Sequence, residues 1–276
     1  MVATPIGNLA DVTLRALHVL QIADAIACED TRHTQALLRA YGIDKSAAHW
    51  VAVHQHNEAQ AAQAVLERLH QGQRVAYASD AGTPAISDPG ARLVAAVRLA
   101  GLPAIPLPGA SSVTTALSVA GIAAEDESDG AFVFVGFLPT KAGERAGAIE
   151  ALAQERRSVV LLEAPHRIQA LATALAALGK RTITIGRELT KQFEEIASLA
   201  AAGFPAWLAA DDNRRRGEFV IVLHPLQKTA PDAPDDQVLR LLLAELPLKT
   251  AVKLAAEITG QSRNSLYEMA LKLKQG

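Results

Sequence analysis

The chain is poor in cysteine, in aromatic residues and in excess charge of either sign. Cys28 is the only cysteine among 276 residues, so no disulfide can form within the chain and a reducing compartment is expected. Aromatic residues make up only 4% and hydrophobic residues 50%, so alanine, leucine and valine must build the core. The formal net charge is −2, so any contact with RNA must come from local patches rather than from overall charge.

Several familiar segments and motifs are also missing. No apolar run reaches the roughly 18 residues of a membrane-spanning helix, and residues 1–8 lack the basic and apolar regions of a signal peptide. The Gly-x-Gly-x-x-Gly and Gly-x-x-x-x-Gly-Lys-Ser/Thr fingerprints do not occur. The pair His54-x-His56 is better explained as part of a polar loop than as a metal site. These absences favour a soluble cytoplasmic protein that contacts no membrane.

The first 120 residues alternate between predicted strands and predicted helices. Such alternation predicts a mostly parallel sheet with crossover helices and a ligand-binding crevice at the carboxyl ends of its strands. After a strand stub near residue 2, we expect strands over residues 23–28, 50–53, 74–78 and 102–107. We expect helices over residues 13–22, 34–40, 58–71 and 91–100, and another one that begins near residue 112.

Three polar loops share this predicted edge, over residues 4–8, 79–90 and 108–112. In the second loop, glycines permit close backbone approach or positive φ, and prolines stiffen the path. The third loop, Pro108-Gly109-Ala110-Ser111-Ser112, begins a helix whose N-terminus offers free N–H groups to a polar or anionic ligand. Each loop alone could be a turn that caps a helix, as Ser87 or Asp88 could do. Three such loops at one edge favour a binding site.

Charged residues also follow the strand over residues 23–28. Glu29, Asp30 and Arg32 are costly to bury at a strand end, so they are candidates for a site. The alternative is a polar N-cap for the next helix. The isolated Cys28 just before them belongs to a buried strand, and we expect a packed thiol rather than a nucleophile.

The second half contains a second α/β domain. Strands are expected over residues 131–137, 158–162, 181–186 and 217–224, after an acidic candidate linker at 123–130. Arg167, Arg187 and Lys191 follow strands and form a basic cluster suited to phosphates. The alternative is a solvated rim whose positive charge is partly neutralised by neighbouring glutamates. A further basic run, residues 214–216, lies in a loop and is open to the same two interpretations.

The C-terminal segment is separated by a Pro/Asp-rich linker at 229–236. Three short helices are expected, over residues 238–246, 249–258 and 263–273. From residue 237 onward, six basic side chains against three acidic ones give a charge of +3. This segment is either a small basic helix-turn-helix-like module or a bundle for packing or dimerisation. The predicted domains are therefore residues 1–124, 130–226 and 236–276.

Taken together, these motifs resemble those of the tetrapyrrole-methylase-like superfamily of S-adenosylmethionine-dependent methyltransferases. They are most similar to its bacterial branch that methylates the ribose 2′-oxygen of a cytidine in the decoding region of 16S ribosomal RNA. The tetrapyrrole branch usually has a Gly-x-Gly-Pro-Gly-Asp first loop, where this chain has Thr4-Pro5-Ile6-Gly7-Asn8. The resemblance covers essentially the whole chain. Its other carriers are Glu29-Asp30-Thr31-Arg32, His56-Asn57-Glu58, residues 79–84 and 86–90, Pro108-Gly109-Ala110-Ser111, Gly136-Phe137-Leu138-Pro139, Pro165-His166-Arg167-Ile168 and Arg187-Glu188-Leu189-Thr190-Lys191.

The resemblance implies a fold, a cofactor and a set of residues that bind it. The fold consists of two α/β domains with S-adenosylmethionine in the cleft between them, plus the small C-terminal helical module, and the assembly is usually a homodimer. Carried over by position, the cofactor contacts are Pro5, Ile6, Asp80, Gly82, Thr83, Ala110, Ser111, Ser112, Leu138, Leu189, Glu218 and Phe219.

The implied reaction is an in-line displacement in which the ribose 2′-oxygen attacks the methyl group of a sulfonium, and it needs no metal. Alignment supplies much of the rate, and a base or a cation assists the weakly acidic hydroxyl. Asp30 and Glu163 are candidate bases, with Asp30 beside Arg32 favoured, and Lys191 is a candidate to stabilise the alkoxide. We expect the assembled small ribosomal subunit to be the substrate. The expected RNA contacts are Arg167, Arg187, Arg214, Arg215, Lys249, Lys253 and Arg263.

Two other functions are compatible with parts of the sequence. A C-methyltransferase that acts on a tetrapyrrole (a porphyrinoid) would share the cofactor cleft but would need a roomy apolar pocket for the macrocycle. A non-catalytic nucleic-acid-binding protein would rest on the C-terminal module alone and would leave the three loops unexplained.

Overall fold

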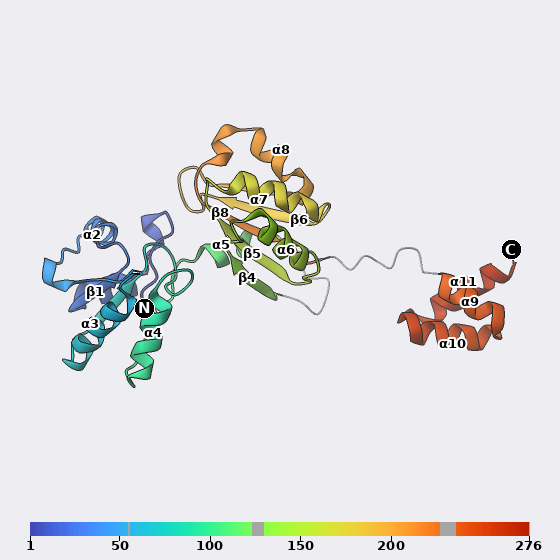
Figure 1. The fold of residues 1–276 in the computed structure, drawn as a ribbon, viewed down its shortest axis with the longest axis horizontal. Coiled ribbons are helices and arrows are strands. Elements are labelled where there is room, and N and C mark those ends of the chain that lie inside the picture. The colour runs from blue at the N-terminus through green and yellow to red at the C-terminus, as the bar shows by residue number, and fades with distance from the viewer. Residues whose placement is uncertain (55, 123–129, 227–235, 276) are drawn as a thin grey trace. The chain divides into compact units, whose positions relative to one another are not determined.

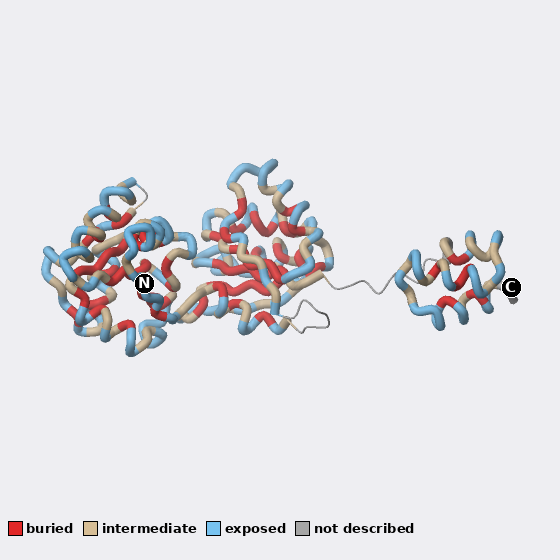
Figure 2. The backbone as a smooth tube through the Cα atoms, turned by 90° about the horizontal axis from the view of Figure 1, so that it is seen from below, coloured by how far each residue is buried: buried red, intermediate tan, exposed pale blue. Residues whose placement is uncertain are grey.

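A computed structural model describes residues 1–54, 56–122, 130–226 and 236–275, and most of the two predicted linkers lies outside these ranges. The chain forms two compact units, residues 1–226 and residues 227–276 (Figure 1). Buried residues concentrate along the sheets of the first unit and inside the helices of the second (Figure 2). The first unit contains two sheets, which are described in turn.

The first sheet has three strands rather than the larger number expected, and all of them are parallel, which agrees with the mostly parallel sheet that was predicted. Its order is β2-β1-β3, formed by Trp50–Ala52, Ala25–Cys28 and Val75–Ala78. Because side chains alternate along a strand, its two faces are covered by different helices. On one face Ile26 and Ala76 belong to a core shared with α1 (Leu14–Ile22) and α2 (Thr31–Ala40), and on the other Ala27 and Tyr77 pack with α3 (Glu58–His70) and α4 (Gly90–Leu99).

The N-terminal residues extend this sheet beyond β3. The Val2 N–H donates to the Tyr77 carbonyl at 2.8 Å, and Val2 forms bridges with Ala78 and Leu107. The predicted strand over residues 102–107 is wrong, because Leu107 alone takes part in a bridge. Pro103 and Pro106 lack the N–H groups that a strand ladder needs, which explains the difference.

The second sheet has five strands in the order β4-β5-β8-β6-β7. The strands β4 (Phe132–Gly136) and β5 (Ser158–Glu163) are parallel, and the pairs β5–β8, β8–β6 and β6–β7 are antiparallel. The prediction missed β7 (Glu195–Ala200), an edge strand in which no residue is fully buried. The other strands are β6 (Thr182–Arg187) and β8 (Phe219–Leu223).

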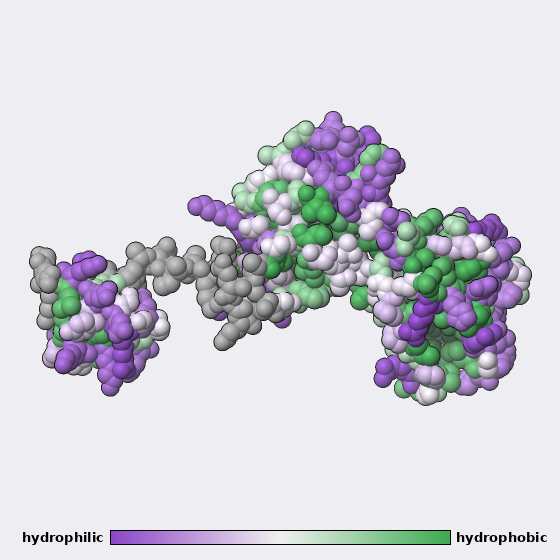
Figure 3. Space-filling view, turned by 180° about the vertical axis from the view of Figure 1, so that it is seen from behind, coloured by the Kyte–Doolittle hydropathy of each residue, from purple (hydrophilic) through white to green (hydrophobic). Residues whose placement is uncertain are grey.

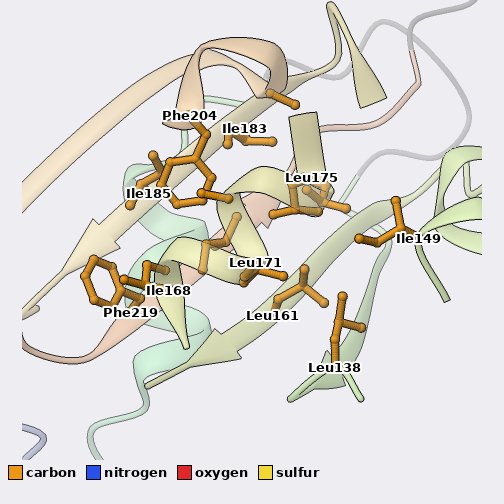
Figure 4. Close-up of a cluster of buried hydrophobic side chains, with 14 of the residues drawn as sticks. Leu138, Ile149, Leu161, Ile168, Leu171, Leu175, Ile183, Ile185, Phe204 and Phe219 are labelled. Atoms are coloured by element: carbon orange, nitrogen blue, oxygen red, sulfur yellow. The ribbon is translucent and has the colours of Figure 1, made fainter. Parts of the chain in front are cut away.

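Helices from both halves of the unit cover this second sheet. On one face α6 (Ala142–Ala153), α7 (Ile168–Leu175) and α8 (Phe204–Ala209) pack on side chains such as Leu161 and Ile185 (Figure 4). On the other face α5 (Ser112–Val119) packs on Val220 and Val222, together with Ile6. A helix that precedes the predicted domain boundary at residue 124 therefore completes the core of the second sheet, and this packing ties the two halves together.

The second unit is a bundle of three helices, as predicted. They are α9 (Asp236–Glu245), α10 (Leu248–Thr259) and α11 (Arg263–Gln275), and their core includes Leu239, Val252 and Leu266. Gly260, at φ 71°, ends α10 in the left-handed conformation that favours glycine. Short 3-10 helices in the first unit are η1 (Leu9–Asp11), η2 (Ala47–His49), η3 (Ala176–Leu178), η4 (Ala201–Gly203) and η5 (Asp212–Arg215). Over the described ranges, every helix is too short or too polar to cross a membrane.

Candidate active site

Hydrogen bonds join the three predicted loops at one edge of the first sheet. Thr4 and Gly82 exchange two backbone hydrogen bonds of 3.0 Å, which link the first loop to the second. The hydroxyl of Thr83 donates to the Ala110 carbonyl at 3.0 Å, which links the second loop to the third. Gly82 has a φ of 77°, and a Cβ atom there would lie 3.2 Å from Ile6. The expectation that the loops share an edge is confirmed.

Asp88 organises the remainder of the second loop. Its carboxylate accepts hydrogen bonds from the N–H groups of Ala85 at 2.9 Å and Gly90 at 2.7 Å, and from the Tyr77 hydroxyl at 3.1 Å. Asp88 therefore satisfies a first-turn N–H of α4, which confirms the capping role expected for this part of the loop. The same loop contains Ala85 and Ser87 at positive φ values of 68° and 72°, a strain that the sequence did not indicate.

A cavity of about 260 Å³ opens beside these loops, and both halves of the first unit line it. Its walls are mostly apolar, with charged groups gathered on the side of the second sheet. The residues that line it are Ile6, Ala81, Ser112, Phe137, Leu162, Glu163, Ala164, Pro165, Leu189, Lys191, Glu218, Phe219 and Val220.

The predicted cofactor residues divide into two groups by their position. The structure brings five of them to the cavity: Ile6, Ser112, Leu189, Glu218 and Phe219. The others are not among the lining residues and lie in the loops or in the core: Pro5, Asp80, Gly82, Thr83, Ala110, Ser111 and Leu138. Ala81, between Asp80 and Gly82, was not predicted and does line the cavity. Its side chain has no polar atoms, so no sequence pattern pointed to it.

Lys191 carries the positive charge in the cavity lining. Its ammonium donates to Glu188 Oε1 at 2.9 Å and to Glu218 Oε2 at 2.8 Å. Burial lowers the pKa of Lys191, and its hydrogen bonds to Glu218 and Glu188 raise it by more, so the pKa lies above its ordinary value and the group stays protonated. The sequence analysis named Glu188 only as a member of the motif at residues 187–191. Its contact with Lys191 was not predicted from the spacing of the two residues.

Glu163 is the acid most deeply buried in the cavity lining. Its side chain is 1% exposed and lies 3.1 Å from the Nε atom of Arg167, whose guanidinium also donates to the Leu138 carbonyl. The N–H of Ala164 donates to Glu163 Oε1 at 2.9 Å. One predicted catalytic acid and one predicted RNA contact are therefore paired with each other at the cavity.

Asp30 and Arg32 do not line the cavity. Asp30 is the N-cap of α2 and accepts from the N–H groups of Arg32 at 2.8 Å and His33 at 3.4 Å. Side-chain and backbone hydrogen bonds from Arg32 hold the pKa of Asp30 below its ordinary value. The Asp30 N–H donates to Asp80 at 3.2 Å, so this pair belongs to the framework that supports the second loop.

The predicted RNA contacts differ in how far their charges are already paired. Arg187 and Arg214 share Glu195 at 3.5 and 2.8 Å, and Arg214 also stacks on Trp207 with 4.4 Å to the ring centroid. Arg215 is exposed and lies 3.7 Å from Asp212. In the helical unit Lys249, Lys253 and Arg263 are exposed, and Arg263 lies 3.5 Å from Glu257.

Among the described residues, neither a reactive thiol nor a metal-binding cluster adds to the chemistry of this site. Cys28 is buried, and burial raises the pKa of its thiol to about 11, so the packed thiol expected from the sequence is confirmed. Within the described part of the chain, His, Cys, Asp and Glu side chains form no group that could hold a metal ion.

Comparisons with known proteins follow the same division of the chain. Residues 1–202 match the family model described as tetrapyrrole (corrin/porphyrin) methylases, and residues 229–274 match the model described as the RsmI C-terminal HTH domain. Among solved structures, cobalt precorrin-4 methyltransferase matches with a TM-score of 0.57 at 16% identity, covering 80% of this chain and 92% of that one. Diphthine synthase matches with a TM-score of 0.59 at 13% identity, covering 81% and 88%. These likenesses show the fold.

Curated relatives are similar over almost their full lengths. A protein of Neisseria meningitidis serogroup A, named ribosomal RNA small subunit methyltransferase I, is 46% identical, covering 99% of this chain and 93% of that one. Proteins of the same name from Escherichia coli O157:H7 and Pseudomonas aeruginosa are 46% and 44% identical. They cover 99% and 100% of this chain, and 94% and 97% of their own lengths.

Proposed function

This chain belongs to the family of tetrapyrrole (corrin/porphyrin) methylases, and from that premise we propose that it transfers a methyl group from S-adenosylmethionine to the RNA of the small ribosomal subunit. The observation that carries the proposal is the identity of 43–46% over nearly the whole chain to proteins named ribosomal RNA small subunit methyltransferase I. The match of residues 229–274 to the C-terminal domain model of that group supports the same substrate.

We propose further that the acceptor is the ribose 2′-oxygen of a cytidine in the decoding region of 16S ribosomal RNA, within the assembled subunit. The sequence motifs favour this branch of the family. A net charge of −2 also makes indiscriminate binding to naked RNA unfavourable. A folded particle offers additional surfaces, which the helical unit can contact.

The residues around the cavity fit S-adenosylmethionine. Ile6, Leu189 and Val220 offer apolar walls for a flat aromatic base, whereas polar side chains suit the methionine part. The N-cap of α5, Ser111, makes no side-chain hydrogen bond to the helix, so the first-turn N–H groups are available to an anionic group such as a carboxylate. A solved uroporphyrin-III C-methyltransferase of this fold, with a TM-score of 0.53, is complexed with S-adenosylhomocysteine, which agrees with this assignment.

When bound, S-adenosylmethionine supplies a methyl group on a sulfonium that is already activated for in-line displacement. The protein then contributes chiefly alignment, and favourable alignment supplies up to roughly 7–11 kcal/mol. Ile6, Ala81 and Ser112 hold one side of the cavity, and the three hydrogen-bonded loops fix their positions. Lys191 places a protonated donor at the other side, where it can position a phosphate or stabilise an alkoxide.

For proton removal from the 2′-hydroxyl, the geometry favours Glu163 over Asp30. Glu163 lines the cavity, whereas Asp30 caps α2 and has a lowered pKa.

For contacts with RNA phosphates, the geometry favours the exposed Arg215, Lys249, Lys253 and Arg263 over Arg187 and Arg214, which are paired with Glu195. The face of the helical unit seen in Figure 3 is mostly hydrophilic, which suits a docking module. We propose that the enzyme acts in the cytoplasm as a homodimer.

The test is methyl transfer from labelled S-adenosylmethionine in three parallel reactions. One contains small ribosomal subunits from cells that lack the protein, one contains naked 16S RNA, and one contains a porphyrinoid. We expect label in the subunit RNA, and removal of residues 237–276 should weaken binding of the subunit more than binding of the cofactor. Label in the porphyrinoid alone would support the tetrapyrrole alternative. Absence of cofactor binding would support a non-catalytic nucleic-acid-binding protein.

A further inference from the structure

We propose that Glu188 is a positioning residue for methyl transfer, because its carboxylate fixes the ammonium group of Lys191 at the wall of the cavity. The inference rests on the function proposed above and deepens it. Neither the family motif nor the spacing of the residues assigns this role to Glu188. Three observations carry it: a strained backbone, a notch left by a glycine, and the unequal exposure of the two acids that contact Lys191.

The backbone around the cavity residue Leu189 is strained on both sides. Glu188 has a φ of 50° and Thr190 has a φ of 67°, although neither is glycine. A β-branched residue such as threonine rarely adopts positive φ, and such strain persists only where the surroundings enforce it. Here the Asn8 N–H donates to Thr190 Oγ1 at 3.1 Å, and the Thr190 N–H donates to Glu194 at 2.6 Å. The strained segment therefore presents Leu189 and Lys191 to the cavity in a single arrangement.

Glu188 lies in a notch that a glycine leaves open. A Cβ atom on Gly217 would contact Glu188 Cγ and would lie 2.6 Å from its Cδ and Oε1 atoms. Glu188 Oε1 accepts both the Glu218 N–H at 2.8 Å and the Lys191 ammonium at 2.9 Å, and the Glu188 N–H donates to the Glu218 carbonyl at 2.9 Å. One carboxylate thus joins the strained segment, the start of β8 and the cavity lysine.

The two acids on Lys191 differ in exposure. The side chain of Glu188 is 19% exposed and that of Glu218 is 76% exposed. Water screens the contact with the exposed Glu218, so a bound ligand can replace Glu218 as a partner of Lys191 at little cost. The contact between Lys191 and Glu188 is retained. Lys191 therefore acts as a fixed donor with one permanent partner. A long side chain with only an exposed partner would need to be ordered in every catalytic cycle.

The first experiment measures Lys191 in the full-length protein without any cofactor. Acetylation of Lys191 by a soluble acylating reagent is followed by mass spectrometry in wild type, Glu188→Gln and Glu218→Gln. Glutamine keeps the shape of Glu188 and its acceptor for the Glu218 N–H, but removes the charge. Loss of the less exposed carboxylate should lower the pKa of Lys191 and raise its acylation rate by roughly tenfold, with a smaller change for Glu218→Gln. Equal rates in wild type and Glu188→Gln would overturn the proposal.

The second experiment is a double-mutant cycle on turnover with Glu188→Gln, Lys191→Met and the double variant. If Glu188 acts through Lys191, Glu188→Gln lowers kcat by roughly tenfold with little change in KM for the cofactor, and has no further effect beside Lys191→Met. A merely structural role would lower kcat equally in both backgrounds, which would overturn the proposal.

The matched control is Glu144→Gln, which breaks the exposed Lys141–Glu144 pair of 3.0 Å with the same spacing of three residues. It should leave turnover unchanged and change the acylation of Lys141 only slightly. If wild type transferred no methyl group to RNA, the proposed function would fail, and the acylation experiment would still decide whether Glu188 holds the Lys191 ammonium.

Discussion

The two walls of the cavity are built by different means. The first wall, formed by Ile6, Ala81 and Ser112, carries no charge and is held by hydrogen bonds between loops. The second wall, from Leu162–Pro165, Leu189, Lys191 and Glu218–Val220, carries the charged side chains and a strained backbone. The first wall therefore supplies shape and the second supplies charge. This division suits a reaction that needs a tightly held cofactor and an oriented polar acceptor.

The joint between the walls can be broken by Gly7→Ala. A Cβ atom at residue 7 would contact Lys191 Cγ and would lie 2.8 Å from Thr190 Oγ1 and 3.2 Å from the Leu189 carbonyl. Because the two walls must shift apart, we expect methyl transfer to fall by about 100-fold, the scale that displacement by about 1 Å can produce. The measurement is turnover together with S-adenosylhomocysteine affinity by calorimetry.

The control for this change is Gly143→Ala in α6, where a Cβ atom would meet nothing within 4 Å. It should keep full turnover and stabilise the protein by roughly 0.5–1 kcal/mol, since alanine is the better helix former. Full activity in Gly7→Ala would show that catalysis does not require the two walls to keep a fixed position relative to each other.

The assignment of the charged chemistry to the second wall is sharpened by Glu163→Gln and Asp30→Asn, two isosteric changes. We expect Glu163→Gln to lower turnover by roughly 100-fold, the lower end of what a general base contributes. Asp30→Asn should leave turnover near wild type and stability within about 0.5 kcal/mol, because asparagine caps helices as well as aspartate. Single-turnover assays with saturating cofactor measure both. The reverse order of effects would restore Asp30 as the base.

The role of shape in the first wall is tested by Thr83→Val, which removes the hydrogen bond to the Ala110 carbonyl. We expect a loss of about 1 kcal/mol, seen as a roughly fivefold weaker affinity for S-adenosylhomocysteine with kcat nearly unchanged. Thr173→Val, which removes a bond of 3.0 Å to the Gln169 carbonyl in α7, is the matched control. It should not alter the affinity. Equal affinities in all three proteins would contradict the role given to this link.

The smallest expected effect concerns the second sheet below neutral pH. Burial and the nearby Arg181 lower the pKa of His224, whose ring lies 2.8 Å from the Thr184 hydroxyl. The unfolded chain therefore binds a proton more readily than the folded one. The stabilising contribution is complete above the unfolded pKa of about 6.5 and is lost as the pH falls toward the lower folded pKa.

Thermal unfolding of wild type and His224→Gln between pH 8 and pH 5 checks this expectation. The Tm of wild type should fall more steeply with decreasing pH than that of the variant. Parallel curves would show that His224 has the same pKa in both states.

The sequence predicts elements and loops better than side-chain contacts. Periodicity located the helices of the first 120 residues and of the C-terminal segment, and the parallel strands, whereas the polar residues at strand ends located the three loops. The prediction failed at residues 102–107, where prolines interrupt an apolar run, and at β7, an edge strand whose residues are all exposed or half-buried. Likewise, Ala81 lines the cavity together with Ile6, and Glu188 lies in the notch left by Gly217, and both positions depend on the tertiary fold. No spacing in the sequence encodes them.

The most direct test of the central claim is mass mapping of 16S ribosomal RNA from a strain that lacks this protein. We predict the loss of a single methyl group from the ribose of one cytidine in the decoding region. A plasmid encoding wild type should restore it, and one encoding Gly7→Ala should not. An unchanged methylation pattern in the deletion strain would contradict the claim.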